Sequence, residues 1–176
     1  GTTFITPFPV QMTGNFLTPG SSQVQDIVVG TSVGRFRVYN TGFAPITVSR
    51  LHFVDHGFHS GALPTYQLVA SGQQNAPDYL STTVLAEQSS LNFALPAAGV
   101  RIDSGSFRDF TVSLKNLGGA VSGDSWQLSA DTLGASQYQV SETDLHYDGN
   151  ANGKLDELIT ALPIDGTPAL GTLVKQ

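Results

Sequence analysis

The sequence predicts an all-β fold in which two sheets pack as a sandwich, with one short helix near the C-terminal end. Apolar and polar residues alternate with a period of two in several segments, whereas the longer period of a helix is rare. Clusters of Gly, Asn, Asp and Ser separate these segments, as turns separate the short strands of a sandwich. Hydrophobic residues make up 40% of the chain and charged residues only 12%. A core must therefore form, and uncharged polar side chains must cover it, as in many extracellular β-proteins.

Three alternating runs are the clearest predicted strands, each with one buried and one wet face. Their apolar members are Phe36 and Val38, then Phe110, Val112 and Leu114, and then Trp126, Leu128 and Ala130. Residues 47–53 and 170–174 are further predicted strands. Residues 155–162 are the predicted helix, which Pro163 ends because proline cannot continue the hydrogen-bond ladder.

Two of these strands end in the same pattern. Asn40-Thr-Gly42 is followed by an apolar run at 45–49, and Asn116-Leu-Gly118 by the run at 126–130. A strand that closes in Asn-x-Gly before a second strand resembles the hairpins of immunoglobulin-like modules in bacterial and archaeal surface proteins, including the outer domains of archaeal pilins and archaellins. The resemblance implies an immunoglobulin-like or jelly-roll β-sandwich exported to the cell surface, and it brings no catalytic residues with it.

Composition limits the remaining possibilities. The 176 residues suffice for one domain spanning 1–176 with a sizeable core. Cysteine is absent, so no disulfide or cysteine-ligated metal can form. The net charge is -6 and the eight Lys and Arg residues are scattered, which argues against a nucleic-acid partner. No apolar run is long enough to span a membrane. Gly1 in place of Met fits a mature exported chain or a trimmed one. We expect an extracellular or cell-surface location.

The most informative segment is a predicted calcium loop within residues 144–159. Oxygen-bearing side chains fall at loop positions 1, 3, 5 and 9, a glycine stands at position 6, and a main-chain carbonyl is available at position 7. The predicted ligands are Asp148, Asn150, Asn152, the carbonyl of Lys154, and Asp156. The segment 148–159 resembles the EF-hand-like calcium loops of dockerins and other secreted bacterial modules. The resemblance implies calcium as the bound ion.

The loop departs from that pattern at position 12, where Ile159 replaces the expected carboxylate. Glu157, Asp144 and Glu142 are the candidates for the missing ligand. The residues before the loop, 138–145, are predicted to be extended, so we expect a strand–loop–short-helix arrangement instead of helix–loop–helix. The alternative is an Asn- and Gly-rich turn that holds no ion.

The N-terminal segment, residues 1–17, is strongly apolar. Phe4, Phe8, Val10 and Met12 need burial, and Pro7 and Pro9 restrict the segment to an edge position. Two arrangements satisfy both conditions: an ordinary first strand on its own domain, or a strand donated to the sheet of a neighbouring copy.

Two weaker motifs resemble catalytic or metal-binding sites. Gly30-Thr-Ser32-Val-Gly34 matches the nucleophile elbow of serine hydrolases, but a strand follows the serine where that motif requires a helix. His52, His56 and His59 stand near Asp55, yet they span a predicted strand and a loop, and not one face of a helix. We therefore expect solvated or locally bonded histidines without a high-affinity zinc or copper site.

These features favour a non-enzymatic structural role. The leading hypothesis is a subunit of an extracellular filament or pilus-like fibre, a calcium-stabilised homopolymer assembled by strand donation. The rival is a secreted, calcium-stabilised carbohydrate-binding or adhesion module whose partner is a polysaccharide. An enzyme is the third reading.

Overall fold

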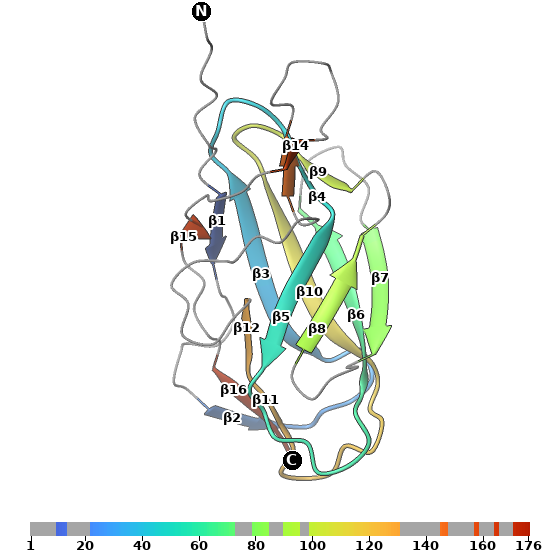
Figure 1. Cartoon of the computed structure of the whole chain (residues 1–176). Coiled ribbons are helices and arrows are strands. Elements are labelled where there is room, and N and C mark those ends of the chain that lie inside the picture. Colours follow the sequence, from blue (N-terminus) through green and yellow to red (C-terminus); the bar gives the residue numbers. More distant parts are fainter. Residues whose placement is uncertain are drawn as a thin grey trace, which may run out of the picture.

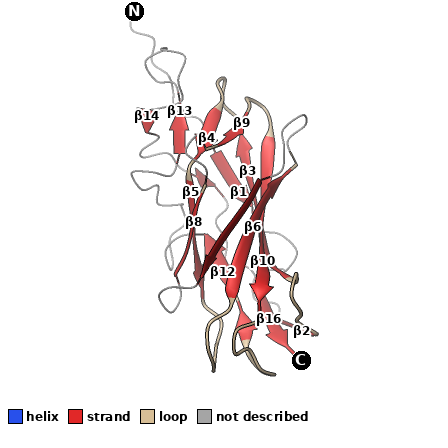
Figure 2. Cartoon of the chain, turned by 90° about the vertical axis from the view of Figure 1, so that its right-hand side faces the viewer, coloured by secondary structure: helices blue, strands red, loops and turns tan. Residues whose placement is uncertain are grey.

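The computed structural model describes residues 10–13, 22–72, 79–84, 90–95, 99–130, 145–147, 157–158, 164–165 and 171–176. Every regular element in these ranges is a β-strand, which confirms the predicted all-β class (Figures 1 and 2).

The largest sheet has six strands in the order β15-β1-β3-β10-β6-β7. Their bounds are Ile164–Asp165 (β15), Val10–Thr13 (β1), Ser32–Asn40 (β3), Phe107–Asn116 (β10), Thr65–Ser71 (β6) and Tyr79–Val84 (β7). All neighbours are antiparallel except β1 and β15, which run parallel.

A second layer faces this sheet and consists of two smaller sheets (Figure 2). One contains β12 (Leu128–Ala130), β5 (Arg50–Asp55) and β8 (Ser90–Ala94), and the other β14 (Glu157–Leu158), β13 (Leu145–Tyr147), β4 (Ile46–Val48) and β9 (Val100–Ile102), in those orders. Only Ser49 separates β4 from β5, and its carbonyl accepts the N–H of Leu95 at 2.9 Å. The two sheets therefore follow each other along one layer.

A fourth sheet lies at one end of the molecule, with the strand order β11-β16-β2 (Figure 1). Its strands are Ser125–Trp126 (β11), Thr172–Lys175 (β16) and Ser22–Gln25 (β2). The predicted strand at 170–174 corresponds to β16, and the predicted strand at 47–53 is divided at Ser49 into β4 and β5.

The core fills the space between the two layers. Phe36 of β3 stacks on Phe53 of β5 with ring centroids 4.5 Å apart, and Phe53 meets Phe93 of β8 edge-on at 5.9 Å. The predicted alternation is confirmed in the described side chains of all three runs: Phe36, Val38, Phe110, Val112, Leu114, Trp126 and Leu128 are buried. Burial of these rings and aliphatic side chains is the main force that holds the layers together.

The Asn-x-Gly strand ends are not hairpins, contrary to the prediction. After Asn40 the chain crosses to β4 in the facing layer, and after Asn116 it crosses to β11 in the end sheet. In both turns the Asn Oδ1 accepts the N–H of the glycine two residues later, at 3.1 and 3.0 Å. The buried Asn40 amide also donates to the carbonyls of Ala44 (2.7 Å) and Ile102 (3.1 Å), so the turn is fixed to both layers it connects.

The predicted helix at 155–162 is also corrected where the structure describes it. Glu157 and Leu158 form β14, and Leu158 is the antiparallel partner of His146 in β13. Pairing with β13, itself paired to β4, gives these backbone groups cross-strand partners in place of helical ones. The remaining residues of 155–162 lie outside the described ranges.

The first and last described residues, Val10 and Gln176, lie at opposite ends of the molecule. Val10 pairs with Asn40, the last residue of β3, so β1 begins at what we call the Asn40 end. The C-terminal Gln176 donates its N–H to the carbonyl of Gln25 at 2.8 Å, beside β2 and near the start of β3 at Ser32. We call this the β2 end (Figure 1).

Candidate functional site

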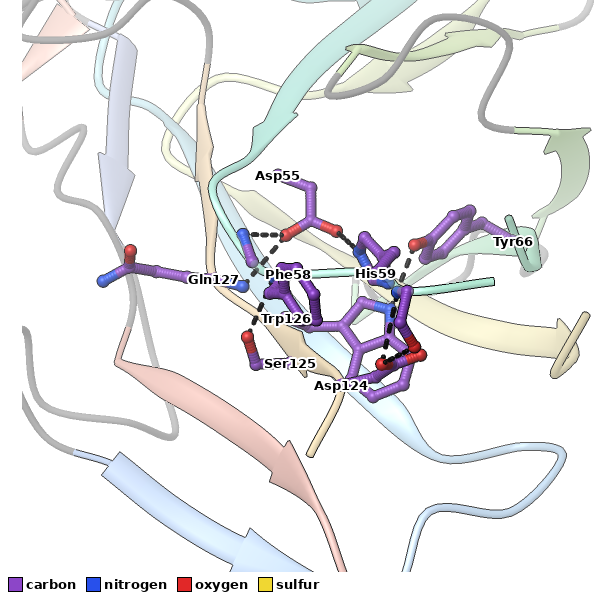
Figure 3. A network of polar contacts seen from close by, with 10 residues as sticks. Asp55, Phe58, His59, Tyr66, Asp124, Ser125, Trp126 and Gln127 are labelled. Carbon is purple, nitrogen blue, oxygen red and sulfur yellow. Dashed lines mark hydrogen bonds and ion pairs between the residues drawn. The ribbon is translucent and has the colours of Figure 1, made fainter. Parts of the chain in front are cut away.

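A dense polar cluster in the described part of the chain is built around Asp55, the last residue of β5 (Figure 3). Its carboxylate is fully buried. Oδ1 accepts the N–H groups of Gly57 (2.8 Å) and Gln127 (3.0 Å), and Oδ2 lies 2.6 Å from Nε2 of His59. Both oxygens therefore have partners, as a buried carboxylate requires.

His59 connects this carboxylate to the aromatic core. Its side chain is only 7% exposed, and its ring meets Trp126 edge-on at 5.3 Å. Nδ1 is buried with no hydrogen-bond partner, so we assign the hydrogen to Nε2, where it is donated to Asp55. A bare acceptor at Nδ1 costs less than an unpaired N–H donor at that position would.

Tyr66 lies at the inner end of the cluster. Its hydroxyl accepts a hydrogen bond from Trp126 Nε1 at 3.0 Å, and its ring is fully buried. Burial raises the pKa of the Tyr66 hydroxyl far above its usual value, and the negative charge of Asp55 raises it further. Tyr66 therefore stays neutral.

The same residues join two loops that are distant in sequence. Asp124 Oδ1 accepts hydrogen bonds from the hydroxyl and N–H of Ser60, at 2.7 and 3.3 Å, and Ser125 exchanges bonds with the backbone of Phe58 (Figure 3). A Cβ on Gly57 would lie 2.0 Å from the Ser125 carbonyl oxygen, so only glycine allows this approach. The β5–β6 loop is thus bonded to the β10–β11 connection.

We call the cluster of Asp55, His59, Tyr66, Asp124 and Trp126 a structural clamp, because it bonds the two loops to each other. Its Asp and His side chains are buried, and their hydrogen bonds are made to residues within the protein. Among the described residues, no three His, Cys, Asp or Glu side chains converge as metal ligands. Of the other two histidines in the segment 52–59, His56 donates its N–H to the Gln127 carbonyl at 2.7 Å, and His52 lies in β5 opposite Asn92. The absence of a high-affinity metal remains a prediction.

Sequence reasoning missed this cluster, although a signal was present. Asp55-His-Gly57 is a third turn of the type seen at Asn40 and Asn116, because the Asp55 oxygen accepts the N–H of the glycine two residues later. An Asx-x-Gly sequence ends β3, β5 and β10 alike. The turn at Asp55 could therefore be predicted from the local sequence. A locally bonded histidine near Asp55 was expected, and His59 is one, although it is buried and not solvated. The distant partner Gln127 could not be predicted.

Asp124 should make the protein less stable in acid. Burial opposes its ionised form, but hydrogen bonds from Ser60 and Val121 outweigh that effect, and the pKa of Asp124 lies below its usual 3.8. Ionised Asp124 therefore stabilises the fold above that pH, and the contribution declines as the pH falls from 3.8 through the folded-state pKa. Asp124→Asn should be less stable than the parent near neutral pH. Urea unfolding between about pH 2 and 6 should show this difference shrinking in acid; a constant difference would contradict the assignment.

The calcium-loop ligands predicted from sequence fall mostly outside the described residues. These are Asp144, Asp148, Asn150, Asn152, Lys154 and Asp156, while Glu157 is described in its backbone only. The flanking strands are described: Tyr147 of β13 is the antiparallel partner of Glu157 of β14. A strand–loop–strand hairpin therefore holds the two ends of the segment 148–156 together.

The predicted assembly residues divide in the same way. Phe4 and Phe8 lie outside the described residues, whereas Val10 and Met12 belong to β1 and pair with Asn40 and Val38 of β3 in the same chain. In the single chain, this part of the N-terminal segment is thus a strand of its own sheet. At the other weak motif, Ser32 begins the long strand β3, which excludes the strand–turn–helix geometry of a nucleophile elbow.

A second polar cluster lies on the six-stranded sheet. Arg37 donates two hydrogen bonds to Asp109, from Nε to Oδ1 at 2.6 Å and from Nη2 to Oδ2 at 3.0 Å. These bonds raise the pKa of the guanidinium above its usual value. The guanidinium also covers the Phe107 ring, 4.0 Å from its centroid. Because that face is occupied, it is not free to stack on a sugar ring.

No family model matches this chain, and no curated protein does. Among solved structures, one similar chain is a family 123 glycoside hydrolase from Clostridium perfringens, described for the hydrolysis of glycolipid glycans. The identity is 11%, the TM-score is 0.33, and the match covers 97% of this chain but only 27% of that one. Likeness at this level supports no statement about activity. Among the described residues, no helix has the length and apolarity needed to cross a membrane.

Proposed function

We propose that the protein is a non-enzymatic structural subunit of an extracellular filament or pilus-like fibre, with an immunoglobulin-like or jelly-roll sandwich stabilised by calcium. The observation that carries this proposal is the placement of β1. Its first residue pairs with the last residue of β3, so the apolar N-terminal residues join the fold at the Asn40 end. The C-terminal strand and the open strand β2 lie at the opposite end.

Such a layout favours head-to-tail association. A contact between two different surfaces at opposite ends does not close on itself, so it generates a linear polymer. Phe4 and Phe8 supply apolar side chains that need burial, and each would contribute about 1.5 to 3 kcal/mol on entering a neighbour. Val10 and Met12 anchor the donating segment to its own subunit through β1.

Removal of residues 1–9 is the direct test. The deletion leaves every described strand in the chain, so the product should remain folded, with an unchanged circular dichroism spectrum, but should stay monomeric. Light scattering and electron microscopy should show polymers for the full chain alone. A full chain that remains monomeric over all concentrations would refute the fibre, and unfolding of the shortened chain would assign the segment to its own core.

We propose calcium binding at the hairpin between β13 and β14. Asp148 and Asp156 are the sequence neighbours of Tyr147 and Glu157, the pair that closes the loop. Pairing of the two flanking strands supports the site because it reduces the entropy lost when distant ligands converge. β13 also pairs with β4, so an ordered loop would stabilise the second layer.

Chelation of calcium should lower the melting temperature. The loop lacks the position-12 carboxylate, so we expect a Kd on the order of 10⁻⁴ to 10⁻³ M, as in extracellular modules. At millimolar calcium the fold should gain roughly 1 to 2 kcal/mol by mass action. Calorimetry should detect binding to the parent chain and none to Asp148→Ala, and magnesium serves as the ion control. No heat and no change in melting temperature would favour the ion-free turn.

One observation favours the rival, a module that binds carbohydrate or adheres to a surface. Phe43 is 94% exposed in the crossing that follows Asn40, and an exposed ring can stack on a sugar. A monomeric protein retained on an insoluble polysaccharide, and released by Phe43→Ala, would support that function in place of the fibre.

A further inference from the structure

Among the described strands, β2 has an unpaired outer edge. It is the last strand of the end sheet β11-β16-β2, and within the described ranges nothing pairs with its outer side. The carbonyl of Gln25 faces β16, since it accepts the N–H of Gln176 at 2.8 Å. Backbone groups alternate in direction along a strand, so the N–H and C=O of Val24 point away from β16 toward the open edge. An added strand would satisfy these groups.

Exposed apolar side chains gather at the β2 end of the molecule. The large hydrophobic residues exposed at the β2 end are Val24 (64%), Val28 (52%), Val29 (62%), Phe58 (63%) and Val121 (52%). Val24 belongs to β2 itself, and Val28 and Val29 follow that strand in the chain. Phe58 and Val121 lie across the same small sheet, beside β11, because Phe58 is bonded to Ser125 and Val121 to Asp124. Only one further large hydrophobic residue, Phe43, is comparably exposed in the described part of the chain. The edge therefore combines unpaired backbone groups with apolar surface, the two features that an added apolar strand covers.

The N-terminal segment has the complementary chemistry. Pro7 and Pro9 lack an N–H, and their spacing of two puts both missing donors on the same edge of an extended strand. The opposite edge keeps the N–H groups of Phe4, Thr6 and Phe8, and the same alternation puts the two phenylalanines on one face. Such a segment can pair along one edge only, so it would complete a sheet without inviting another strand.

The positions of residue 10 and of β2 at opposite ends of the molecule indicate that a second copy supplies residues 1–9. Residues 1–9 join the fold at the Asn40 end, whereas β2 lies at the far end of β3, near Ser32. Head-to-tail stacking brings the Asn40 end of one copy to the β2 end of the next. We propose that the free edge of β2 is the acceptor for residues 1–9 of a second copy, which pair there as an added strand. This inference rests on the proposed fibre and names its contact surface.

Substitution at the edge separates this contact from the fibre itself. Val24→Lys introduces a charge at an exposed edge position, so the subunit should fold with an unchanged melting temperature. The protein concentration needed for assembly, measured by light scattering on the full chain, should rise at least about tenfold. The matched control is Asn92→Lys, the same charge at an exposed position of β8, the outer strand of another sheet, and it should assemble normally. Equal assembly of both variants would overturn β2 as the acceptor, while a monomeric parent would overturn the fibre as well.

Cross-linking tests the same contact by proximity. The natural chain has no cysteine, so Thr6→Cys combined with Val24→Cys provides the sole pair of thiols. Mild oxidation should produce a ladder of covalent dimers, trimers and longer species on a non-reducing gel, and Thr6→Cys with Asn92→Cys should not. A fast-migrating monomer would show that the segment reaches β2 of its own chain, and the absence of any cross-link in assembled protein would place the acceptor elsewhere. Either result would overturn the proposal.

Discussion

Replacing Phe53 with alanine should lower the free energy of unfolding by about 3 to 5 kcal/mol, the usual cost of removing a buried ring. Phe53 is 1% exposed and stands between Phe36 of the six-stranded sheet and Phe93 of β8. The loss combines the transfer of the ring to water with a cavity between the two layers. Its size depends on how far Phe36 and Phe93 can collapse into that space.

Urea denaturation followed by tryptophan fluorescence measures this effect, because Trp126 is the single tryptophan and is buried. Phe43→Ala is the matched control, since it deletes the same ring at a position that is 94% exposed. It should change stability by less than about 0.5 kcal/mol. Equal effects of the two substitutions would show that the layers do not pack through Phe53.

Asp55→Ala should also lower the free energy of unfolding by about 3 to 5 kcal/mol, although it removes only a small side chain. The substitution leaves the N–H groups of Gly57 and Gln127 and the Nε2–H of His59 without their acceptor. Each unsatisfied buried donor costs about 1 to 3 kcal/mol, and entry of water into the space would offset part of the sum. Asp55 is fully buried, so solvent does not screen these bonds.

Asp55→Asn distinguishes the hydrogen bonds from the charge. The amide oxygen still accepts both backbone N–H groups, while the amide nitrogen requires His59 to place its hydrogen on Nδ1, where no acceptor lies. We expect a loss of about 1 to 2 kcal/mol by the same reasoning. In NMR spectra of the variant, the ¹⁵N chemical shift of His59 Nδ1 should become that of a protonated ring nitrogen, and the shift of Nε2 that of an unprotonated one. An Asn variant as unstable as the Ala variant would mean that the negative charge, and not the bonding pattern, stabilises the loop.

The two Asn-x-Gly turns show which features of the fold can be predicted from local sequence and which cannot. In Asn40-x-Gly42 and Asn116-x-Gly118, the side-chain oxygen and the N–H it accepts are two residues apart, so the sequence sufficed to predict a turn. The direction of the chain after each turn depends on distant partners such as Ile102 for Asn40. The prediction of hairpins therefore failed at both positions, although the turns themselves are present.

The N-terminal segment and the predicted helix show the same limit. Alternation at Val10 and Met12 predicted a strand, and β1 is one, but nothing local specifies β3 as its partner. Leu155 to Leu162 has an apolar spacing that suits a helix, yet Leu158 pairs with His146. For a short segment, tertiary pairing outweighs propensity because a strand neighbour supplies the backbone hydrogen bonds that an isolated helix would otherwise make.

The all-β class, the buried face of each main strand and the positions of the turns could be predicted from the amino-acid sequence, because alternation and Asx-x-Gly bonding act between residues close in the chain. The neighbours of each strand and the side chains that form the clamp depend instead on contacts between residues far apart in the chain. Asp55 and Gln127 are 72 residues apart, and Trp126 and Tyr66 are 60 apart. Period-two alternation is the same whatever strand lies alongside, so the pairing that joins such residues is set by the burial of the whole core and not by any local pattern.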